Sequence, residues 1–252
     1  MQSISMTHLY SCLSVMAGLK LGSAKDMEER VKTVVVGVVA WTATFIGVRK
    51  VLSKRSFDFC NRVVSLIHVA VALWLCSVSI QDWKNPLHPS ASPASPSQIH
   101  ALAVSLSYFI YDSICCLFDS SISISNCIHH LVSVSGLGGG VIYAKCGSEL
   151  IGCLWLMEIS NPFMHMRELL KELGYKDSSL SLINDVCFAV VFTLARLIIG
   201  PYIVYVTVTA DNPLIIKVTS VGLQVVSIFW FFKIVKMVKY KLIKAKMPKK
   251  RL

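Results

Sequence analysis

Apolar residues in this sequence gather into long runs that are separated by short polar stretches. Seven of these runs are close to the ~20 residues that a helix needs to cross a bilayer. The predicted spans are 33–52, 62–80, 99–118, 128–145, 149–167, 182–209 and 213–235. The pattern therefore predicts an all-α fold, that of a polytopic membrane protein with about seven transmembrane helices.

The composition supports this prediction. The 252 residues are 54% hydrophobic and only 15% charged, with a mean hydropathy of +0.63, whereas soluble domains carry about 25% charged residues. The formal net charge of +11 would suit nucleic acid, but nine of the 25 Lys and Arg lie in residues 233–252, so we expect no nucleic-acid partner. The nine cysteines form no C-x-x-C pair, and we expect them to be apolar packing residues.

The chain divides into four regions. Residues 1–32 hold an apolar stretch too short to span a bilayer and are expected to be poorly ordered or interfacial. Residues 33–56 form a first transmembrane helix and a basic loop, residues 57–240 hold the other spans, and residues 241–252 are a basic tail. The Pro- and Ser-rich loop 81–98 cannot be helical across its prolines, and we interpret it as a linker in preference to a cover.

Basic residues favour one orientation in the membrane. The loops after the first and fifth spans and the tail are rich in Lys and Arg, which predicts a cytosolic C-terminus. The chain ends Lys249-Lys250-Arg251-Leu252, which resembles the dilysine signal that retrieves membrane proteins to the endoplasmic reticulum. The favoured location is therefore the endoplasmic reticulum membrane. Attraction of a basic tail to anionic lipid is the alternative interpretation of these lysines.

Ionisable groups lie inside the predicted spans, where a charge is costly and usually faces a protein interior or a water-filled cavity. Asp112, Glu158 and Arg196 fall near the midplane, and Arg196 is expected to pair with Glu158 or Asp112. We predict a polar cavity that opens to the cytosol and closes towards the lumen. Buried pairs that fix helix register are the alternative. Besides Arg196, the expected cavity residues are Asn61, Ser65, His68, Tyr108, Ser133 and His165.

Two adjacent histidines, His129 and His130, begin the fourth span. A His in a low-dielectric site can act as a general base or accept an acyl group, and a carboxylate can orient its second ring nitrogen. If the protein is an enzyme, the expected catalytic residues are His129, His130, Glu158 and Asp112. No metal is predicted, because adjacent helical residues point about 100° apart and do not chelate as i, i+4 histidines do.

The order of these motifs resembles the TLC domain family, whose domain is shared by ceramide synthases and the translocating-chain-associated membrane protein. The Pro-rich loop followed by Tyr108-Phe-Ile-x-Asp112 is most similar to the small transmembrane protein 136-like subgroup. The resemblance covers about residues 57–240. Its motifs are Asn61-Arg62-x2-Ser65-x2-His68, Tyr108-Phe109-Ile110-x-Asp112, His129-His130-x2-Ser133, Glu158-x-Ser160-x-Pro162-Phe163-x3-Arg167 and Phe192-x3-Arg196.

The resemblance implies six core helices around a lipid-accessible tunnel, preceded here by the first span. In ceramide synthases the His-His pair is catalytic in acyl transfer from acyl-CoA, and His129 and His130 match that pair. The second acidic motif differs, because Asn161 stands where ceramide synthases carry an acid. We therefore expect a protein of lipid homeostasis that binds or senses lipid in an intramembrane cavity. An acyl-CoA-dependent lipid acyltransferase is the alternative, and a transporter or channel is the less favoured reading.

The expected partners follow from these hypotheses. They are membrane lipids or fatty acyl-CoA, the latter as a co-substrate of the acyltransferase alternative, and no cofactor is expected. A homodimer is compatible with the sequence. In the enzymatic alternative, the acyl chain is expected to lie against Val132, Leu137 and Phe163.

Overall fold

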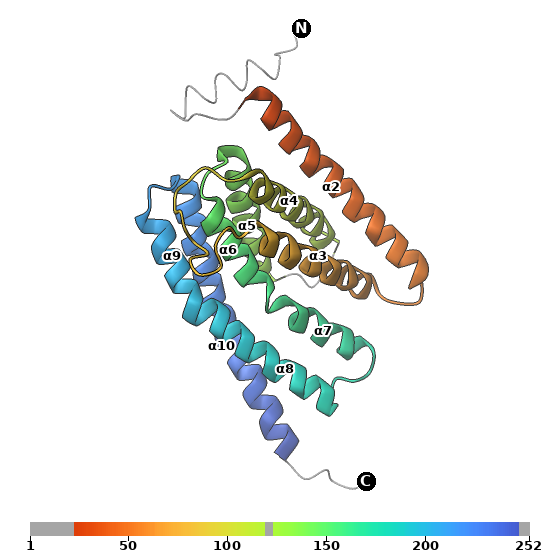
Figure 1. Cartoon of the computed structure of the whole chain (residues 1–252). Helices are drawn as coiled ribbons and strands as arrows, with labels where there is room; N and C mark the ends of the chain where they lie inside the picture. Colours follow the sequence, from red (N-terminus) through yellow and green to blue (C-terminus); the bar gives the residue numbers. More distant parts are fainter. Residues whose placement is uncertain (1–22, 119–122, 247–252) are drawn as a thin grey trace, which may run out of the picture.

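The computed structural model describes residues 23–118 and 123–246, which form a bundle of helices (Figure 1). The predicted all-α fold is confirmed for this part of the chain, whose only β-type pairing is an isolated bridge between Pro93 and Lys145. The predictions for residues 1–22 and for Lys249 and Lys250 lie outside the described residues. The elements are α2 (Ala24–Val51), α3 (Phe57–Ser79), α4 (Pro96–Cys116), α5 (Ile124–Tyr143), α6 (Gly147–Glu158), α7 (Asn161–Glu172), α8 (Ser179–Phe192), η1 (Thr193–Ile199), α9 (Gly200–Thr209) and α10 (Leu214–Lys246).

Five helical stretches in the described residues are long and apolar enough to cross a membrane. They are α2, α3, α4, the continuous run Ser179–Thr209 and Leu214–Ile243 of α10. The chain is thus an integral multi-pass membrane protein. The helix α5 has 20 residues but is less apolar, because its first half carries Asn126, His129 and His130.

The first helix starts earlier than the sequence pattern predicted. Residues 24–32 belong to α2, and the N-terminus of this helix is fixed by a capping box. The Ser23 hydroxyl accepts a hydrogen bond from the Asp26 N–H, and the Asp26 carboxylate accepts one from the Ser23 N–H. Such reciprocal capping satisfies two backbone donors that would otherwise lack partners. Residues 24–32, expected to be poorly ordered or interfacial, are therefore an ordered part of α2.

The fifth predicted span, 149–167, is two helices of 12 residues, α6 and α7. Pro162 lies in the first turn of α7, where it has no N–H to offer the carbonyl of Glu158 and its ring crowds that carbonyl. The ribbon accordingly turns between α6 and α7 (Figure 1). Glu158 and Asn161 lie on either side of this break, so the break places two polar side chains within the bundle.

The sixth predicted span is interrupted by the π-helical segment η1, which contains Arg196. Pro201 has no N–H to donate, and the Gly200 N–H bonds to the Ala195 carbonyl, five residues back. The carbonyl of Arg196 is thereby left without a partner in its own helix. It accepts a hydrogen bond from Gln224 Nε2 of α10 at 3.1 Å instead. π-Helical segments are rare and often occur at functional sites.

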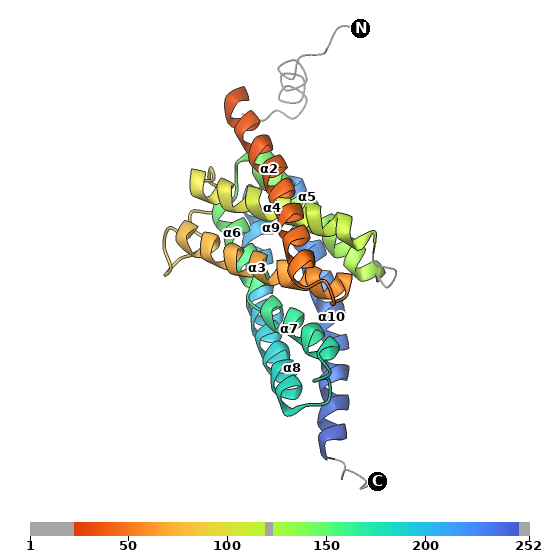
Figure 2. The ribbon, with the colours of Figure 1, turned by 90° about the vertical axis from the view of Figure 1, so that its right-hand side faces the viewer.

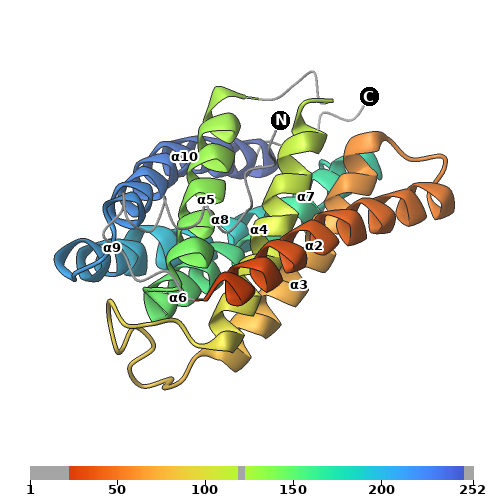
Figure 3. The ribbon, with the colours of Figure 1, turned by 90° about the horizontal axis from the view of Figure 1, so that it is seen from above.

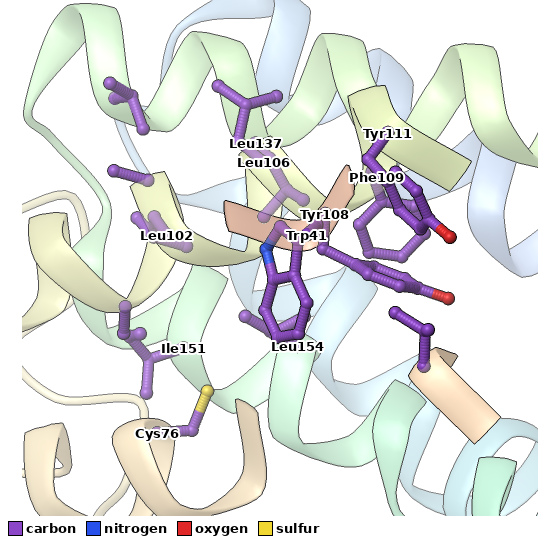
Figure 4. Packing of buried hydrophobic residues seen from close by; sticks show 14 of the residues in the cluster. Trp41, Cys76, Leu102, Leu106, Tyr108, Phe109, Tyr111, Leu137, Ile151 and Leu154 are labelled. Atoms are coloured by element: carbon purple, nitrogen blue, oxygen red, sulfur yellow. The ribbon is translucent and has the colours of Figure 1, made fainter. Parts of the chain in front are cut away.

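The helix α4 is at the centre of the bundle and packs against α2, α3, α5 and α6. Seen from above, α2 and α10 lie on opposite sides of it (Figure 3). A second view shows α8 and α10 side by side, crossing α3 and α4 at a steep angle (Figure 2). Around α4, the aromatic residues Trp41, Tyr108, Phe109 and Tyr111 pack with aliphatic side chains from α5 and α6 (Figure 4). This core holds the helices that surround the candidate site.

The loop between α3 and α4 is a cover on the bundle, which corrects its interpretation as a linker. Leu87 is 7% exposed and packs against Leu156, Ala195 and Ile203. The backbone of the loop also bonds to the α5–α6 turn, where the Cys146 N–H donates to the Ser92 carbonyl at 2.8 Å. The prolines prevent a helix here, so backbone groups of the loop are available for bonds to other parts of the bundle.

Candidate functional site

A cavity lies between α4, α5, α6, the η1–α9 segment and α10. About 660 Å³ of space without protein atoms lies within it and at its open mouth. Its walls are largely apolar, and the apolar residues include Leu137, Leu150, Leu154, Ile216 and Leu223. An apolar cavity inside a membrane-spanning bundle suits a hydrocarbon chain.

One polar group of the cavity is centred on Arg196, which is 3% exposed. Arg196 Nη2 donates to the Met157 carbonyl at 2.7 Å and to Asn161 Oδ1 at 3.1 Å. Asn161 Nδ2 in turn donates to Glu158 Oε2 at 3.0 Å. Asn161 therefore joins the buried cation to the buried acid.

This arrangement corrects the predicted direct pairing of Arg196 with Glu158 or Asp112. Among the described residues, no carboxylate oxygen is recorded within 4.0 Å of the Arg196 guanidinium. The break between α6 and α7 supplies other acceptors, because carbonyls in the last turn of a helix lack intrahelical partners. Met157 lies in that turn of α6, so its carbonyl replaces a carboxylate.

The second polar group of the cavity is on α5 and consists of His129 and Ser133, one turn apart. The His129 ring lies 4.9 Å from the Trp230 ring, measured between centroids. His129 Nδ1 is buried and has no hydrogen-bond partner among the described residues. A buried ring nitrogen at a cavity wall is available to a ligand, as base, acceptor or nucleophile.

His130 does not line the cavity, because adjacent residues point about 100° apart on a helix. Its Nε2 lies 3.6 Å from Asp112 Oδ2, and its Nδ1 lies 3.1 Å from Ser113 Oγ. Asn61 Nδ2 donates to Asp112 Oδ1 at 2.8 Å. The structure thus separates the histidine pair, with His129 at the cavity and His130 in a polar network with α3 and α4.

That network contains most of the other residues predicted for the cavity. Tyr108 Oη donates to Ser65 Oγ at 2.8 Å, and the His68 ring stacks on Tyr108 with centroids 3.7 Å apart. Neither these three residues nor Asn61 contacts the cavity. They brace α3 against α4 behind Phe109, which does line it. The structure therefore does not bring these four residues together with His129 at this cavity.

His165 of α7 is also outside the cavity, although it is buried and its Nδ1 has no partner among the described residues. Of the three residues expected along an acyl chain, only Leu137 lines the cavity. Val132 instead packs near Gly222, and Phe163 packs with Phe188 and Phe192 in a separate cluster. Val132 and Phe163 therefore do not face the cavity, although other residues of α5 and α7 do.

The cavity extends further than predicted. It reaches Glu149 in the first turn of α6 and Thr207 of α9, which the predicted topology puts on the luminal side. Sequence reasoning did not assign Glu149 to the cavity. It also missed Asn212, which binds Glu149, and Gln224, which binds the Arg196 carbonyl. The signal for Gln224 was a polar residue inside an apolar span. Asn212 sits in an ordinary Asn-Pro turn sequence and gave no such signal.

One group of side chains in the described part of the chain has donor atoms close enough to hold a metal ion. These donors belong to Asp112, Cys116 and His130 and lie within 4.8 Å of one another. Asp112 and His130 already have protein partners in Asn61 and Ser113. The absence of a metal stays a prediction.

Comparison with known proteins adds to this geometry. Residues 58–236 match the family model of the TLC domain. A relative from Dictyostelium discoideum, TLC domain-containing protein 4 C, is 24% identical over 199 residues, which is 73% of this chain and 71% of the relative. The matched range starts in the first turn of α3 and ends within α10, so it includes every residue that lines the cavity.

Proposed function

Because the chain belongs to the TLC domain family, we propose that it binds a membrane lipid in the cavity and acts in lipid homeostasis. The observation that carries this proposal is the cavity itself. Apolar walls from α5, α6 and α10 converge on a polar set at His129, Asn161 and Arg196. An apolar cavity with a few fixed polar groups is what an amphiphile with a long chain requires.

Acyl transfer from acyl-CoA to a lipid is the second candidate. It is favoured by His129 Nδ1, which has no hydrogen-bond partner in the described part of the chain. In that reaction, Nδ1 attacks the thioester carbonyl carbon, the C–S bond breaks and coenzyme A leaves as the thiol after taking up a proton. An alcohol or amine on the acceptor lipid then attacks the acyl-imidazole. Its proton is released as the C–N bond to His129 breaks. Arg196 and Asn161 would polarise a carbonyl oxygen held in the cavity.

One experiment tests both candidates with a matched pair of variants. Protein purified in mild detergent is extracted for mass spectrometry of bound lipid, and release of free thiol from fatty acyl-CoA is followed in mixed lipids. The proposal expects a co-purifying lipid in the wild type that is lost in His129→Leu and retained in His130→Leu. The proposal is contradicted if the wild type carries no bound lipid. It is also contradicted if both variants retain as much lipid as the wild type.

The thiol assay then separates the two functions. Removal of a positioned acid–base group typically lowers a rate by about 10²–10⁴-fold. An acyltransferase should therefore lose thiol release in His129→Ala, while His130→Ala, which loses only a positioning contact, is affected less. A wild type that binds lipid but releases no thiol above the background would support binding alone.

The proposed location is the endoplasmic reticulum membrane, with the C-terminus in the cytosol. Support comes from the sequence, where the tail is strongly basic and ends in Lys249-Lys250-Arg251-Leu252. Positive charge near membrane segments favours the cytosolic side. A lipid-handling protein in this membrane would meet newly made lipids.

A further inference from the structure

The end of the cavity away from Arg196 contains a buried carboxylate, that of Glu149. This residue lies in the first turn of α6, is 1% exposed and lines the cavity. An acidic side chain in the first turn interacts favourably with the helix dipole. The position is therefore compatible with an anionic hydrogen-bond acceptor.

One oxygen of this carboxylate is held in place by the protein. Glu149 Oε1 accepts a hydrogen bond from the Ala91 N–H at 2.7 Å and one from Asn212 Nδ2 at 3.1 Å. Asn212 Nδ2 also donates to the Thr207 carbonyl at 2.9 Å. The loop before α4 and the turn before α10 thus fix the carboxylate at the end of the cavity.

The other oxygen of this carboxylate differs from the first in its surroundings. Glu149 Oε2 is buried without a hydrogen-bond partner among the described residues, and so is Asn212 Oδ1 nearby. A carboxylate oxygen is an acceptor, so each of these atoms requires a donor that the surrounding protein does not provide. Buried polar atoms are normally satisfied, and those that are not indicate a water or a ligand.

The opposite end of the cavity contains a donor that lacks an acceptor in the described part of the chain. Arg196 Nε is a buried donor without a partner among the described residues. Arg196 binds the Met157 carbonyl, and Met157 lies eight residues after Glu149 on α6, a rise of about 12 Å. Between these two residues the α6 side chains that line the cavity are Leu150, Cys153 and Leu154. The cavity therefore has an acceptor at one end, a donor at the other and apolar walls between them.

We propose that the cavity selects a hydrocarbon chain with polar groups at both ends, and this inference rests on the proposed lipid-binding function. A carbonyl or carboxylate accepts from Arg196, and a hydroxyl or ammonium group on the distal part of the chain donates to Glu149 Oε2. A plain alkyl terminus leaves the Glu149 carboxylate unsatisfied. The ligand class is thus a hydroxylated or aminated acyl chain.

The test uses full-length protein in detergent and a fluorescent fatty acid as the displaced probe. The competitors are fatty acids of equal length that end in methyl, hydroxyl or amine, each in a series of chain lengths. We expect the wild type to prefer the hydroxyl or the amine over methyl by about tenfold or more, the usual effect of a charge-assisted hydrogen bond. The preference should be greatest at one intermediate length, and the better of the two polar termini identifies the donor.

Two variants of one residue locate the preference. Glu149→Met is apolar and similar in size, so it should abolish the preference for the polar termini. Glu149→Gln keeps an oxygen for Ala91 and Asn212 but turns an N–H group towards the cavity, so it should lose affinity for the amine most. If Glu149→Met does not fold, the affinities of Glu149→Gln and wild type for the amine series still show whether the Glu149 carboxylate causes the preference.

The outcomes separate this inference from the function on which it rests. Equal affinity for the three termini in wild type, as expected if Glu149 binds only an ordered water, overturns the inference alone. A preference that persists in both variants also overturns it. If the wild type binds neither the fluorescent probe nor any competitor, the proposed lipid binding fails as well.

Discussion

Asn161 accepts a hydrogen bond from Arg196 at 3.1 Å across the contact between the α6–α7 break and η1. Its amide group donates at the same time to Glu158 Oε2 at 3.0 Å. An asparagine has both a donor and an acceptor, so it can join a cation to an acid that it does not touch. The neutral residue that replaces an acid in this motif therefore has a defined role in the structure.

The first prediction concerns this bridge. Asn161→Leu removes one acceptor from Arg196 and one donor from Glu158, and each hydrogen bond to a charged group contributes about 1.5–3 kcal/mol. We expect a clear loss of thermal stability in detergent. The midpoint can be followed with a thiol-reactive dye, because Cys60, Cys76 and Cys146 are buried in the folded protein.

A double-mutant cycle with Arg196→Leu supplies the control. The two residues share a hydrogen bond, so the combined loss should be smaller than the sum of the single losses. Ile198→Ala, at a residue of η1 that is 62% exposed, should have little effect. Additive losses in the cycle would show that Asn161 and Arg196 are not coupled.

The second prediction compares two glycines of α2. A Cβ at Gly37 would clash with the Ser107 side chain of α4, whereas one at Gly47 would meet nothing within 4 Å. Ser107 Oγ also accepts a hydrogen bond from Trp41 Nε1 at 3.2 Å. Gly37→Ala should therefore force α2 away from α4, at the ~1–3 kcal/mol typical of overpacking.

Gly47→Ala is the matched control on the same helix. It should be neutral or stabilising by up to about 1 kcal/mol, because alanine loses less backbone entropy than glycine in a helix. Melting midpoints of both variants, measured with the same dye, give the comparison. A Gly37→Ala protein as stable as Gly47→Ala would mean that α2 and α4 are not in close contact at this point.

Sequence reasoning identified the helices well, because apolar length is a property of each segment by itself. It also identified Arg196, His129 and Glu158 as buried polar residues. It did not identify which of them meet, because that depends on two local departures from an α-helix. The break at Pro162 frees the Met157 carbonyl, and the π turn before Pro201 frees that of Arg196. Both prolines were visible in the sequence, but the partners of the freed groups come from other helices.

The loop contacts could not be predicted for a related reason. Leu87 is one apolar residue within a Pro- and Ser-rich stretch, and nothing in its neighbours signals burial. It is buried because the ends of α6 and α9 leave an apolar surface beneath the loop. Likewise, the separation of His129 from His130 follows from helix geometry, but which of them faces the cavity depends on how α5 is rotated in the bundle.

The third prediction is a pH dependence at the contact between α7 and the α2–α3 loop. Partial burial alone would raise the pKa of Glu172, but hydrogen bonds from the Ser56 side chain and backbone, together with Arg55, lower it below its usual value of 4.5. A lowered folded-state pKa stabilises the fold above the unfolded pKa and ceases to do so as the pH falls through the folded pKa. The contribution of Glu172 should therefore be present at neutral pH and disappear in acid below about pH 4.5.

The measurement is the difference in melting temperature between wild type and Glu172→Gln. At neutral pH the variant should melt slightly lower, by a few degrees at most, because exposed polar pairs contribute little. The difference should shrink as the pH falls below about 4.5. In Ser56→Ala, which removes the hydroxyl donor, the substitution Glu172→Gln should have a smaller effect. A difference that grows in acid would contradict the assigned sign.

The fourth prediction concerns location and orientation. Lys249→Ser together with Lys250→Ser should release the protein from the endoplasmic reticulum to later membranes if the two lysines are a retrieval signal. Lys244→Ser with Lys246→Ser removes the same charge from the tail and serves as the control. Equal redistribution in both double variants would favour attraction of the basic tail to anionic lipid. Labelling of a cysteine placed after Leu252 from the luminal side would overturn the cytosolic orientation.

The last prediction concerns the hydrogen bond from Gln224 to the Arg196 carbonyl, which holds η1 against α10 at 3.1 Å. Gln224→Leu leaves that carbonyl buried without a donor, which costs about 1–3 kcal/mol. Because Arg196 also binds Asn161, a shift of this segment should weaken lipid binding as well as stability. Both are measured on the same preparation, by the melting midpoint and by mass spectrometry of the extracted lipid.

Pro201→Ala provides the rescue. Alanine restores an N–H five residues after Arg196, where it can donate to the Arg196 carbonyl in a π turn or allow a regular α-helix to form. The combination of Gln224→Leu and Pro201→Ala should therefore be more stable than Gln224→Leu alone. If the π turn serves to place Arg196 at the cavity, the combined variant regains stability but not bound lipid. Recovery of both would show that the α-helical form places the guanidinium equally well, and recovery of neither would mean that Gln224 acts by another contact.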